Sequence, residues 1–440
     1  MKNKILITLL LFVGVLQAQD KKESYSFSLQ QAIDHALEHN YSGINANRDI
    51  ASAKQKKWET TAAGLPQISG AVNYTNNFKI QQNQFTINGV TNTLEFGNYN
   101  SMDGSLRLSQ LIFDGSYIVA LQASKTYLQY YQNAKLKTNT EIKEMVINAY
   151  GNVLLAEESV AILENNKTLL SKTLGDTQET FKNGLIEEEN VEQLQITLAT
   201  VNSSLNNAKR LQEIALKMLK VTLGIDIDAN LTLTDKLDNL TTSNLDLAFS
   251  QSEFTVKNNI NYQIATNFTD QRSLELKLQR SKALPTLAAN VNFGYNAFDS
   301  QFNLFSQDQK WYNYSNLGVN LSVPIFSSFG RNAKTQQAKI ALDQAKTQLT
   351  ETEQQLKLQY EKAKSEYDFS IEEYATSKSN LNLAERIERK QQIKFTEGLS
   401  SSFDFSEAQR QLYTAQQNYL QSMVNIINKK AALEKIINKN

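Results

Sequence analysis

The sequence predicts an α+β membrane protein made of two tandem structural repeats, each joining a pair of membrane-spanning strands to a long helical hairpin. Three observations predict this class. A Leu-Pro pair precedes a polar, aromatic-rich stretch twice, with prolines at 66 and 285, which are 219 residues apart. A Phe-x-x-Gly-Leu turn also occurs twice, with glycines at 184 and 398, which are 214 residues apart. Long glycine-poor stretches surround these turns. Duplicated units of this kind tend to pack side by side around an axis.

The N-terminus has the features of a secretory signal peptide over residues 1–18. Lys2 and Lys4 precede an apolar run over 5–16, and Leu16-Gln17-Ala18 is an acceptable cleavage site. The run is short for a transmembrane helix, so a retained anchor is the weaker alternative. The chain has no cysteine, which excludes disulfides, thiolate metal sites and a lipid-modified N-terminal cysteine.

Charge and hydropathy narrow the class further. The chain has 45 basic and 45 acidic residues, and this balance gives no support for a nucleic-acid partner. The mean hydropathy of −0.44 would suit a soluble protein. It is also compatible with a β-barrel, because barrel strands alternate apolar and polar residues and so do not raise the average. No apolar stretch near 18 residues follows the signal peptide, so no membrane-spanning helix is predicted.

The clearest strand is 287–297, where apolar residues alternate with small or polar ones. The apolar positions are Leu287, Ala289, Val291, Phe293, Tyr295 and Ala297. A partner strand is predicted over 311–325, and aromatic residues between the two strands resemble an interfacial girdle. The first repeat shows the alternation less clearly. A soluble two-stranded hairpin is the alternative. Segments 79–100 and 298–310 are expected to be loops.

Helices are predicted wherever glycine and proline are missing. Residues 331–397 contain neither, and their apolar residues recur every 3.6 positions, as in a straight helix. Residues 399–440 also lack both. The first repeat has matching runs at 116–183 and 185–223, although Gly151 and Gly175 lie within the longer one. Each helix has a narrow apolar stripe that needs partner helices. Pro66, Pro285 and Pro324 are placed at helix–strand transitions, because proline suits element boundaries.

These elements predict a domain plan for the chain. A signal peptide at 1–18 precedes repeat 1 at 19–224, an inter-repeat or equatorial segment at 225–250, and repeat 2 at 251–440. Each repeat contains a helix, a strand pair and a long helical hairpin. The strand pairs lie at about 67–113 and 286–326, and the helical hairpins at about 116–223 and 329–437.

In this order of motifs the chain resembles the TolC-like outer-membrane efflux proteins, the outer-membrane factors of tripartite efflux and type I secretion systems. The resemblance rests on the Leu-Pro pairs, the Ser-x-x-Ile-Phe ends at 109–113 and 322–326, and the Phe-x-x-Gly-Leu turns at 181–185 and 395–399. It implies a homotrimer with a shared 12-stranded transmembrane β-barrel, four strands per subunit, continued by a long α-helical barrel. Independently, four strands cannot close a barrel, and lipid does not tolerate open strand edges.

The resemblance also implies a function. The trimer would be a passive exit duct, gated at its periplasmic tip, that carries small molecules or secreted polypeptides. It would sit in the outer membrane of a Gram-negative bacterium, with a large periplasmic part. Its partners would be a periplasmic adaptor (membrane fusion protein), an inner-membrane transporter and outer-membrane lipid, with no nucleic acid.

Residues at the helical tips are the candidate functional residues. Gly184, Leu185, Gly398 and Leu399 match the family's adaptor-contacting turns, and the alternative is a helix-ending glycine with a hydrophobic contact. Asp404 and Glu407 match positions that line the channel entrance and set selectivity, where rings of carboxylates favour cations. Alternatively, Asp404 caps the returning helix and Glu407 is its capping-box partner.

One departure from the family concerns the closed entrance. Some members lock it with an Arg and an Asp at the positions of Ser400 and Asn190, so that ion pair is not available in this chain. Glu187, Glu188 and Glu189 lie nearby.

Two other classes of protein compete with the duct. A periplasmic coiled-coil adaptor or scaffold would carry one helical hairpin rather than two. A single-chain porin or outer-membrane enzyme would place strands near the C-terminus, where this chain has a helical run at 431–437. No nucleophile motif, phosphate loop or metal-ligand cluster is present, and the pair His35 and His39 lacks a third ligand. The sequence therefore predicts no enzyme activity, no cofactor and no metal.

Overall fold

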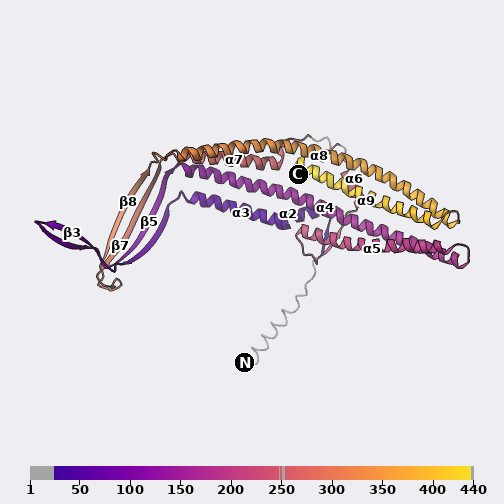
Figure 1. The fold of residues 1–440 in the computed structure, drawn as a ribbon, viewed down its shortest axis with the longest axis horizontal. Helices are drawn as coiled ribbons and strands as arrows, with labels where there is room; N and C mark the ends of the chain where they lie inside the picture. The colour runs from indigo at the N-terminus through magenta and orange to yellow at the C-terminus, as the bar shows by residue number, and fades with distance from the viewer. Residues whose placement is uncertain (1–23, 247, 250–252, 438–440) are drawn as a thin grey trace, which may run out of the picture. The chain divides into compact units, whose positions relative to one another are not determined.

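The computed structural model describes residues 24–246, 248–249 and 253–437. The predicted signal peptide at 1–18 lies outside the described residues. Figure 1 shows the elements in order. In the first repeat they are β1 (Ser24–Phe27), α2 (Leu29–His39), α3 (Tyr41–Ala62), β2 (Gln67–Asn76), β3 (Gln81–Ile87), β4 (Val90–Phe96), β5 (Asn100–Asp114), α4 (Gly115–Lys182) and α5 (Glu188–Leu223). β6 (Asn230–Leu233), α6 (Leu237–Asn244) and the short 3-10 turn η2 (Val256–Asn258) follow, then α7 (Ile260–Ser281), β7 (Thr286–Asp299), β8 (Trp311–Ser322), α8 (Gly330–Thr396) and α9 (Ser402–Ile437).

Four strands, two from each repeat, form one antiparallel sheet in the order β2-β5-β7-β8. The repeats meet at the β5–β7 pair, where Leu106 lies opposite Phe293. β2 and β8 are the two edge strands of this sheet. β8 ends at Ser322 rather than at the predicted residue 325, because Pro324 has no N–H to donate to a ladder.

The sheet has one apolar and one polar face, and both continue across the repeats. On the apolar face Ile68 lies opposite Leu108, which lies opposite Val291, which lies opposite Leu317. These apolar side chains are exposed in the single chain, with Ile68 at 73% and Leu317 at 71%. On the polar face the Tyr314 hydroxyl donates to Asp103 at 2.9 Å. A sheet of this kind is suited to a wall between lipid and water.

The segment between β2 and β5 differs from the prediction. Residues 79–100 are expected to be a loop, but most of them form the antiparallel hairpin β3–β4. Asn88 and Gly89 have positive φ angles of 54° and 82° at its turn. This Asn-Gly pair is the usual sequence for a two-residue hairpin turn.

Helix α4 runs unbroken through Gly151 and Gly175, which interrupt only the glycine-free run of the sequence. A Cβ atom at position 151 would lie 3.5 Å from Val424, which shows that Gly151 faces the point where α9 packs against α4. A glycine inside a helix costs only about 1 kcal/mol relative to alanine, which packing on both sides readily offsets.

Part of α4 is apolar enough to cross a membrane by length and composition, with a mean hydropathy of 1.2 over 18 residues that are 44% buried. Ile142, Val146, Tyr150 and Val153 of this helix are fully buried. They belong to a core cluster with residues of α2, α5 and α9. Packing within the protein therefore accounts for the apolar character of α4 without a membrane span.

The chain divides into two compact units, each of which takes residues from both repeats. Of the described residues, one unit comprises 24–48, 133–246, 248–249, 253–263 and 351–437, and the other comprises 49–132 and 264–350. In the first unit β6 of the inter-repeat segment pairs in parallel with β1, and α6 packs against α9. The second unit contains the four-stranded sheet and the β3–β4 hairpin.

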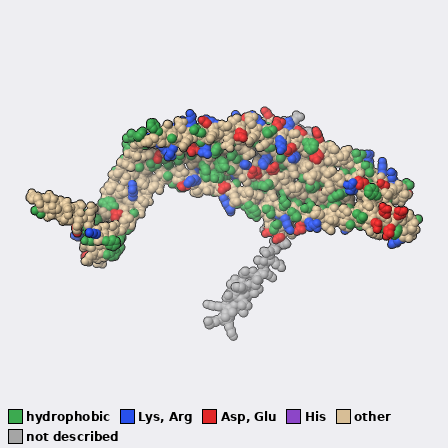
Figure 2. Space-filling model, in the orientation of Figure 1, with side chains coloured by type: hydrophobic (Ala, Val, Ile, Leu, Met, Phe, Trp, Pro, Cys, Tyr) green, Lys and Arg blue, Asp and Glu red, His purple; other side chains and the backbone are tan. Residues whose placement is uncertain are grey.

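Side-chain charge is distributed unevenly over the surface. On the face shown in Figure 2, acidic and basic side chains are frequent over the helices and sparse over the sheet and the β3–β4 hairpin. Helix surfaces of this kind are suited to water, whereas the exposed apolar face of the sheet is not.

Candidate functional site

The two turns at the ends of the helical hairpins have the same geometry. Gly184 and Gly398 have φ angles of 73° and 70°, a region that favours glycine. At the first turn the Leu185 N–H donates to the Thr180 carbonyl at 3.3 Å, and the Gly184 N–H donates to Phe181 at 2.8 Å. The same two bonds recur at Leu399 and Gly398. Both turns are therefore Schellman motifs, which satisfy the last carbonyls of α4 and α8.

The leucines that follow these glycines have no apolar cover. Leu185 is 74% exposed and Leu399 is 78% exposed. In a Schellman motif the residue at this position often packs back on its own helix. Both glycines therefore end their helices, as the alternative reading expects. The hydrophobic contact that it also expects is missing, because both leucines are exposed.

Asp404 takes part in a capping box at the start of α9. The Ser401 hydroxyl accepts from the Asp404 N–H at 3.1 Å and donates to the Asp404 carboxylate at 2.8 Å, and the Ser401 N–H donates to the same carboxylate at 3.4 Å. These bonds from Ser401 lower the pKa of Asp404. Asp404 is exposed.

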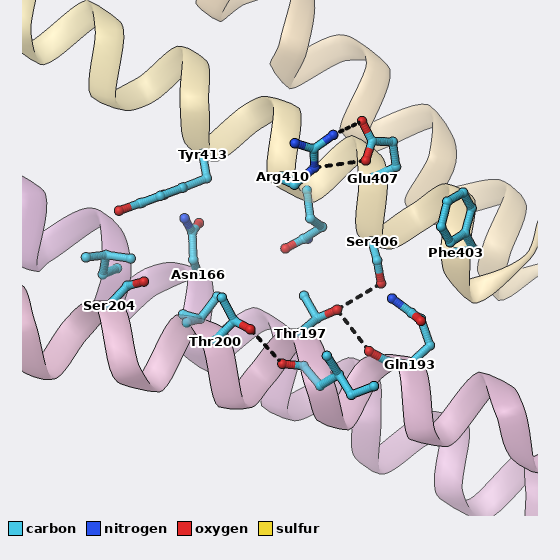
Figure 3. Close-up of a pocket in the computed structure, with 14 residues that line it drawn as sticks. Asn166, Gln193, Thr197, Thr200, Ser204, Phe403, Ser406, Glu407, Arg410 and Tyr413 are labelled. Carbon is cyan, nitrogen blue, oxygen red and sulfur yellow. Dashed lines mark hydrogen bonds and ion pairs between the residues drawn. The ribbon is translucent and has the colours of Figure 1, made fainter.

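Glu407 lies one turn further along α9 and forms an ion pair within the helix. The Arg410 guanidinium donates two hydrogen bonds to it, from Nε at 2.9 Å and from Nη2 at 2.6 Å (Figure 3). Hydrogen bonding to Arg410 lowers the pKa of Glu407. The alternative in which Asp404 is the cap and Glu407 its partner is therefore wrong. Ser401 is the cap and Asp404 is its partner. The sequence alone does not identify the cap, because three consecutive serines offer the helix several possible starts.

Hydrogen bonds hold the side chains at the two positions where the family's ion pair is missing. The Asn190 side-chain oxygen accepts from the Ser402 N–H at 3.2 Å, which joins the start of α5 to the start of α9. The Ser400 hydroxyl donates to Gln391 at 3.1 Å and to the Asp404 carboxylate at 3.4 Å. Asn190 and Ser400 both line a cavity of about 860 Å³ next to the two turns. In this chain a hydrogen bond between uncharged groups links the two hairpins near their tips.

A second cavity, of about 310 Å³, lies between α4, α5 and α9 (Figure 3). Thr197 of α5 and Ser406 of α9 meet at its floor, with their hydroxyl oxygens 3.1 Å apart. Glu407 and Arg410 line one side. Sequence reasoning missed Arg410, although its spacing of three from Glu407 is the usual spacing of a helical ion pair.

A buried carboxyl lies between α8 and α9 near the same tips. Glu388 is 7% exposed and accepts one hydrogen bond, of 2.8 Å, from the buried amide of Gln409. Burial raises the pKa of Glu388, since the charged form loses its hydration. The sequence gives no sign of this burial, because Glu388 resembles any other charged residue of the run.

The three prolines lie between elements. Pro66 and Pro285 directly precede β2 and β7, and Pro324 lies between β8 and α8. His35 and His39 stack with ring centroids 4.1 Å apart. Among the described residues, no group of three or more histidines, aspartates and glutamates has the arrangement of a metal site.

Comparisons with known proteins agree with these features. Residues 258–439 match the family model described as outer membrane efflux protein. No curated protein matches the chain in sequence.

Solved structures match over both repeats. CusC, whose structures concern folding and transmembrane channel formation, is 15% identical, with 96% of this chain and 94% of that chain covered and a TM-score of 0.75. The outer membrane channel CmeC of Campylobacter jejuni is 18% identical, with 93% and 85% covered and a TM-score of 0.73. The outer membrane protein VceC of Vibrio cholerae is 16% identical, with 93% and 95% covered and a TM-score of 0.71.

At these identities the matches establish a shared fold. Together with the family match they confirm the resemblance found in the sequence. Residues 258–439 therefore match the outer membrane efflux protein family in sequence, and both repeats share the fold of these solved outer-membrane channels.

Proposed function

We propose that this protein is a passive exit duct in the outer membrane of a Gram-negative bacterium, through which an inner-membrane pump exports its substrate across periplasm and outer membrane. One observation carries the proposal. The sheet has an apolar face and a polar face that stay in register across all four strands. This is the pattern of a barrel wall that separates lipid from a water-filled interior.

The duct is a homotrimer in this proposal. β2 and β8 have unpaired edges, and a membrane does not tolerate such edges in contact with lipid. Joining β8 of one copy to β2 of the next hides every edge, and three copies make a 12-stranded barrel. The long helices of the three copies continue the duct as a helical barrel in the periplasm.

The two Schellman turns are the proposed docking points for a periplasmic adaptor, which connects the duct to an inner-membrane transporter. Leu185 and Leu399 support this role because both are about three-quarters exposed at the ends of rigid helices. Exposed apolar side chains next to ordered backbone are typical anchors of protein interfaces.

Asp404 and Glu407 are the proposed lining of the duct entrance. Their spacing of three places both carboxylates near one face of α9, and hydrogen bonds keep both of them ionised. The charge of Glu407 is partly cancelled by Arg410, so Asp404 carries most of the proposed preference for cations.

Extraction from cell envelopes tests the membrane location against a periplasmic scaffold. A duct with an apolar barrel wall stays in the membrane in 1 M salt or alkaline carbonate and dissolves only with detergent. A scaffold held by charges comes off in salt. Release of most of the protein by salt alone would overturn the proposal. The scaffold is less well supported, because it gives no role to the exposed apolar face of the sheet.

A further inference from the structure

The β3–β4 hairpin is the described element that the exit duct leaves without a role. Figure 1 shows β3 projecting beyond the ends of β5 and β7. Seven residue pairs, from Gln81–Phe96 to Ile87–Val90, hold it together. It is inserted at the ends of β2 and β5 that lie away from the helices. In a barrel with periplasmic helices, these ends face the outside of the cell.

The two faces of the hairpin differ in chemistry. One face carries only polar pairs, including Gln82–Glu95 at 3.0 Å and Thr86–Thr91 at 3.2 Å. The other face carries five apolar side chains, which are 37–61% exposed: Phe85, Ile87, Val90, Leu94 and Phe96. An isolated two-stranded ribbon is marginally stable in water, so an uncovered apolar face of this size calls for a partner.

The base of the hairpin is held firmly. Asn100 is 3% exposed, and its side-chain oxygen accepts from the Tyr74 hydroxyl and from Asn76, both at 2.7 Å. Its amide donates to the Ser300 carbonyl at 3.3 Å. Ile80, at the foot of β3, is 8% exposed. The base of the hairpin is therefore anchored to the sheet by hydrogen bonds and by a buried side chain.

Two observations indicate what covers the apolar face. Between residues 80 and 99 the chain has one charged residue, Glu95, so nothing in the hairpin attracts an anionic lipid surface or a charged protein. The hairpin also extends β2, an edge strand that must meet another copy of the chain if the barrel is to close. The partner within reach is the same hairpin of a neighbouring copy.

We propose that the hairpins of neighbouring copies pack their apolar faces against one another at the outer mouth of the duct. This inference rests on the proposed trimeric duct. Three identical apolar faces directed at a threefold axis form a small shared core, which covers the mouth and adds a contact between copies outside the membrane.

Single cysteines test the packing, because the chain has no native cysteine. Val90→Cys puts a thiol on the apolar face next to the turn, and Thr91→Cys puts one on the polar face at the neighbouring position. A disulfide needs Cβ atoms about 4 Å apart. Mild oxidation of cell envelopes should link Val90→Cys into dimers at least about tenfold more than Thr91→Cys. Equal linking of the two variants, or no linking of Val90→Cys, would overturn the proposal.

Labelling of intact cells with a membrane-impermeant maleimide separates the possible reasons for failure. The proposal predicts slow labelling of Val90→Cys and fast labelling of Thr91→Cys. Equally fast labelling means that the apolar face is uncovered. Protection of Val90→Cys without linking means that lipid or a foreign protein covers it, which also contradicts packing between copies. If neither variant is labelled until the cells are lysed, the hairpin is not outside the cell, and the proposed duct fails with it.

Discussion

At the residue scale, the two carboxylates proposed to line the entrance differ in how much charge they can offer to a passing ion. Asp404 accepts hydrogen bonds from uncharged serine groups and keeps its full negative charge. Glu407 is paired with Arg410 at 2.6 Å. The opposite charges of this ion pair largely cancel at distances well beyond their own separation.

Replacing both carboxylates by amides, with Asp404→Asn and Glu407→Gln, should reduce the preference of the duct for cations. Arg410→Gln should raise this preference, because it leaves Glu407 without its partner. Reversal potentials across a bilayer in a salt gradient measure both effects. The control is Asp343→Asn with Glu353→Gln, which removes two carboxylates from α8 that are paired with lysines and lie away from the turns. Reversal potentials that stay unchanged in the entrance variants would exclude these residues from the duct lining.

Glu388 predicts a pH-dependent stability. Its pKa is raised in the folded protein, so the unfolded chain ionises at a lower pH than the folded chain does. The folded state therefore loses stability as the pH rises from the ordinary glutamate value through the raised one. Glu388→Gln removes this loss while keeping a hydrogen-bonding partner for Gln409.

The expected gain for Glu388→Gln is on the order of 1 kcal/mol at pH 8, the scale of one poorly satisfied buried polar group. Thermal unfolding of the detergent-purified protein, followed by helical circular dichroism, should show a higher midpoint at pH 8 and little change at pH 4. Glu353→Gln, at an exposed ion pair, is the matched control. A lower midpoint at pH 8 would show that the ionised carboxyl stabilises the fold.

At the scale of elements, each of the two helix turns presents an exposed leucine to another protein. Leu185→Ser together with Leu399→Ser should weaken adaptor binding by at least about tenfold, since each buried leucine is worth roughly 1.5–3 kcal/mol at an interface. Co-purification of the periplasmic adaptor with the tagged duct measures this.

The fold should tolerate these two changes, because both side chains are exposed in the chain. Leu358→Ser is a suitable control, since Leu358 is 70% exposed on α8 but lies away from the turn. Adaptor recovery equal to that of the control would contradict a role for the turn leucines.

The elements also show how far sequence patterns reach. The alternation at 287–297 and the glycine-poor runs locate β7 and the long helices, because the period and length of an element can be read directly from the order of its residues. The β3–β4 hairpin is missed because Gln, Asn and Thr dominate it and hide its alternation, although Asn88-Gly89 is a turn signal. The continuity of α4 through Gly151 depends on α9, a contact between residues 273 positions apart in the sequence (151 and 424).

The candidate site shows the same limit. Spacing places Asp404 and Glu407 on the same helix and Gly184 and Gly398 at turns. Which serine caps α9, and whether Arg410 reaches Glu407, depends on where the helix begins and on rotamers. The hydrogen bond from Ser402 to Asn190 joins two hairpins and has no counterpart in local sequence.

At the scale of the whole molecule, the central claim is that copies of this chain close a barrel around water. The unpaired edges of β2 and β8 and the exposed apolar face of the sheet both support this claim. A single copy left in a membrane would expose a row of backbone donors and acceptors on each edge strand.

Single-channel conductance of the detergent-purified protein in a planar bilayer tests this claim most directly. The account predicts stable conductance steps that prefer cations, from a species with the mass of three chains. Where the wild-type protein is silent, the recording is repeated with the Asp404→Asn, Glu407→Gln variant. Silence from both proteins would contradict a membrane duct.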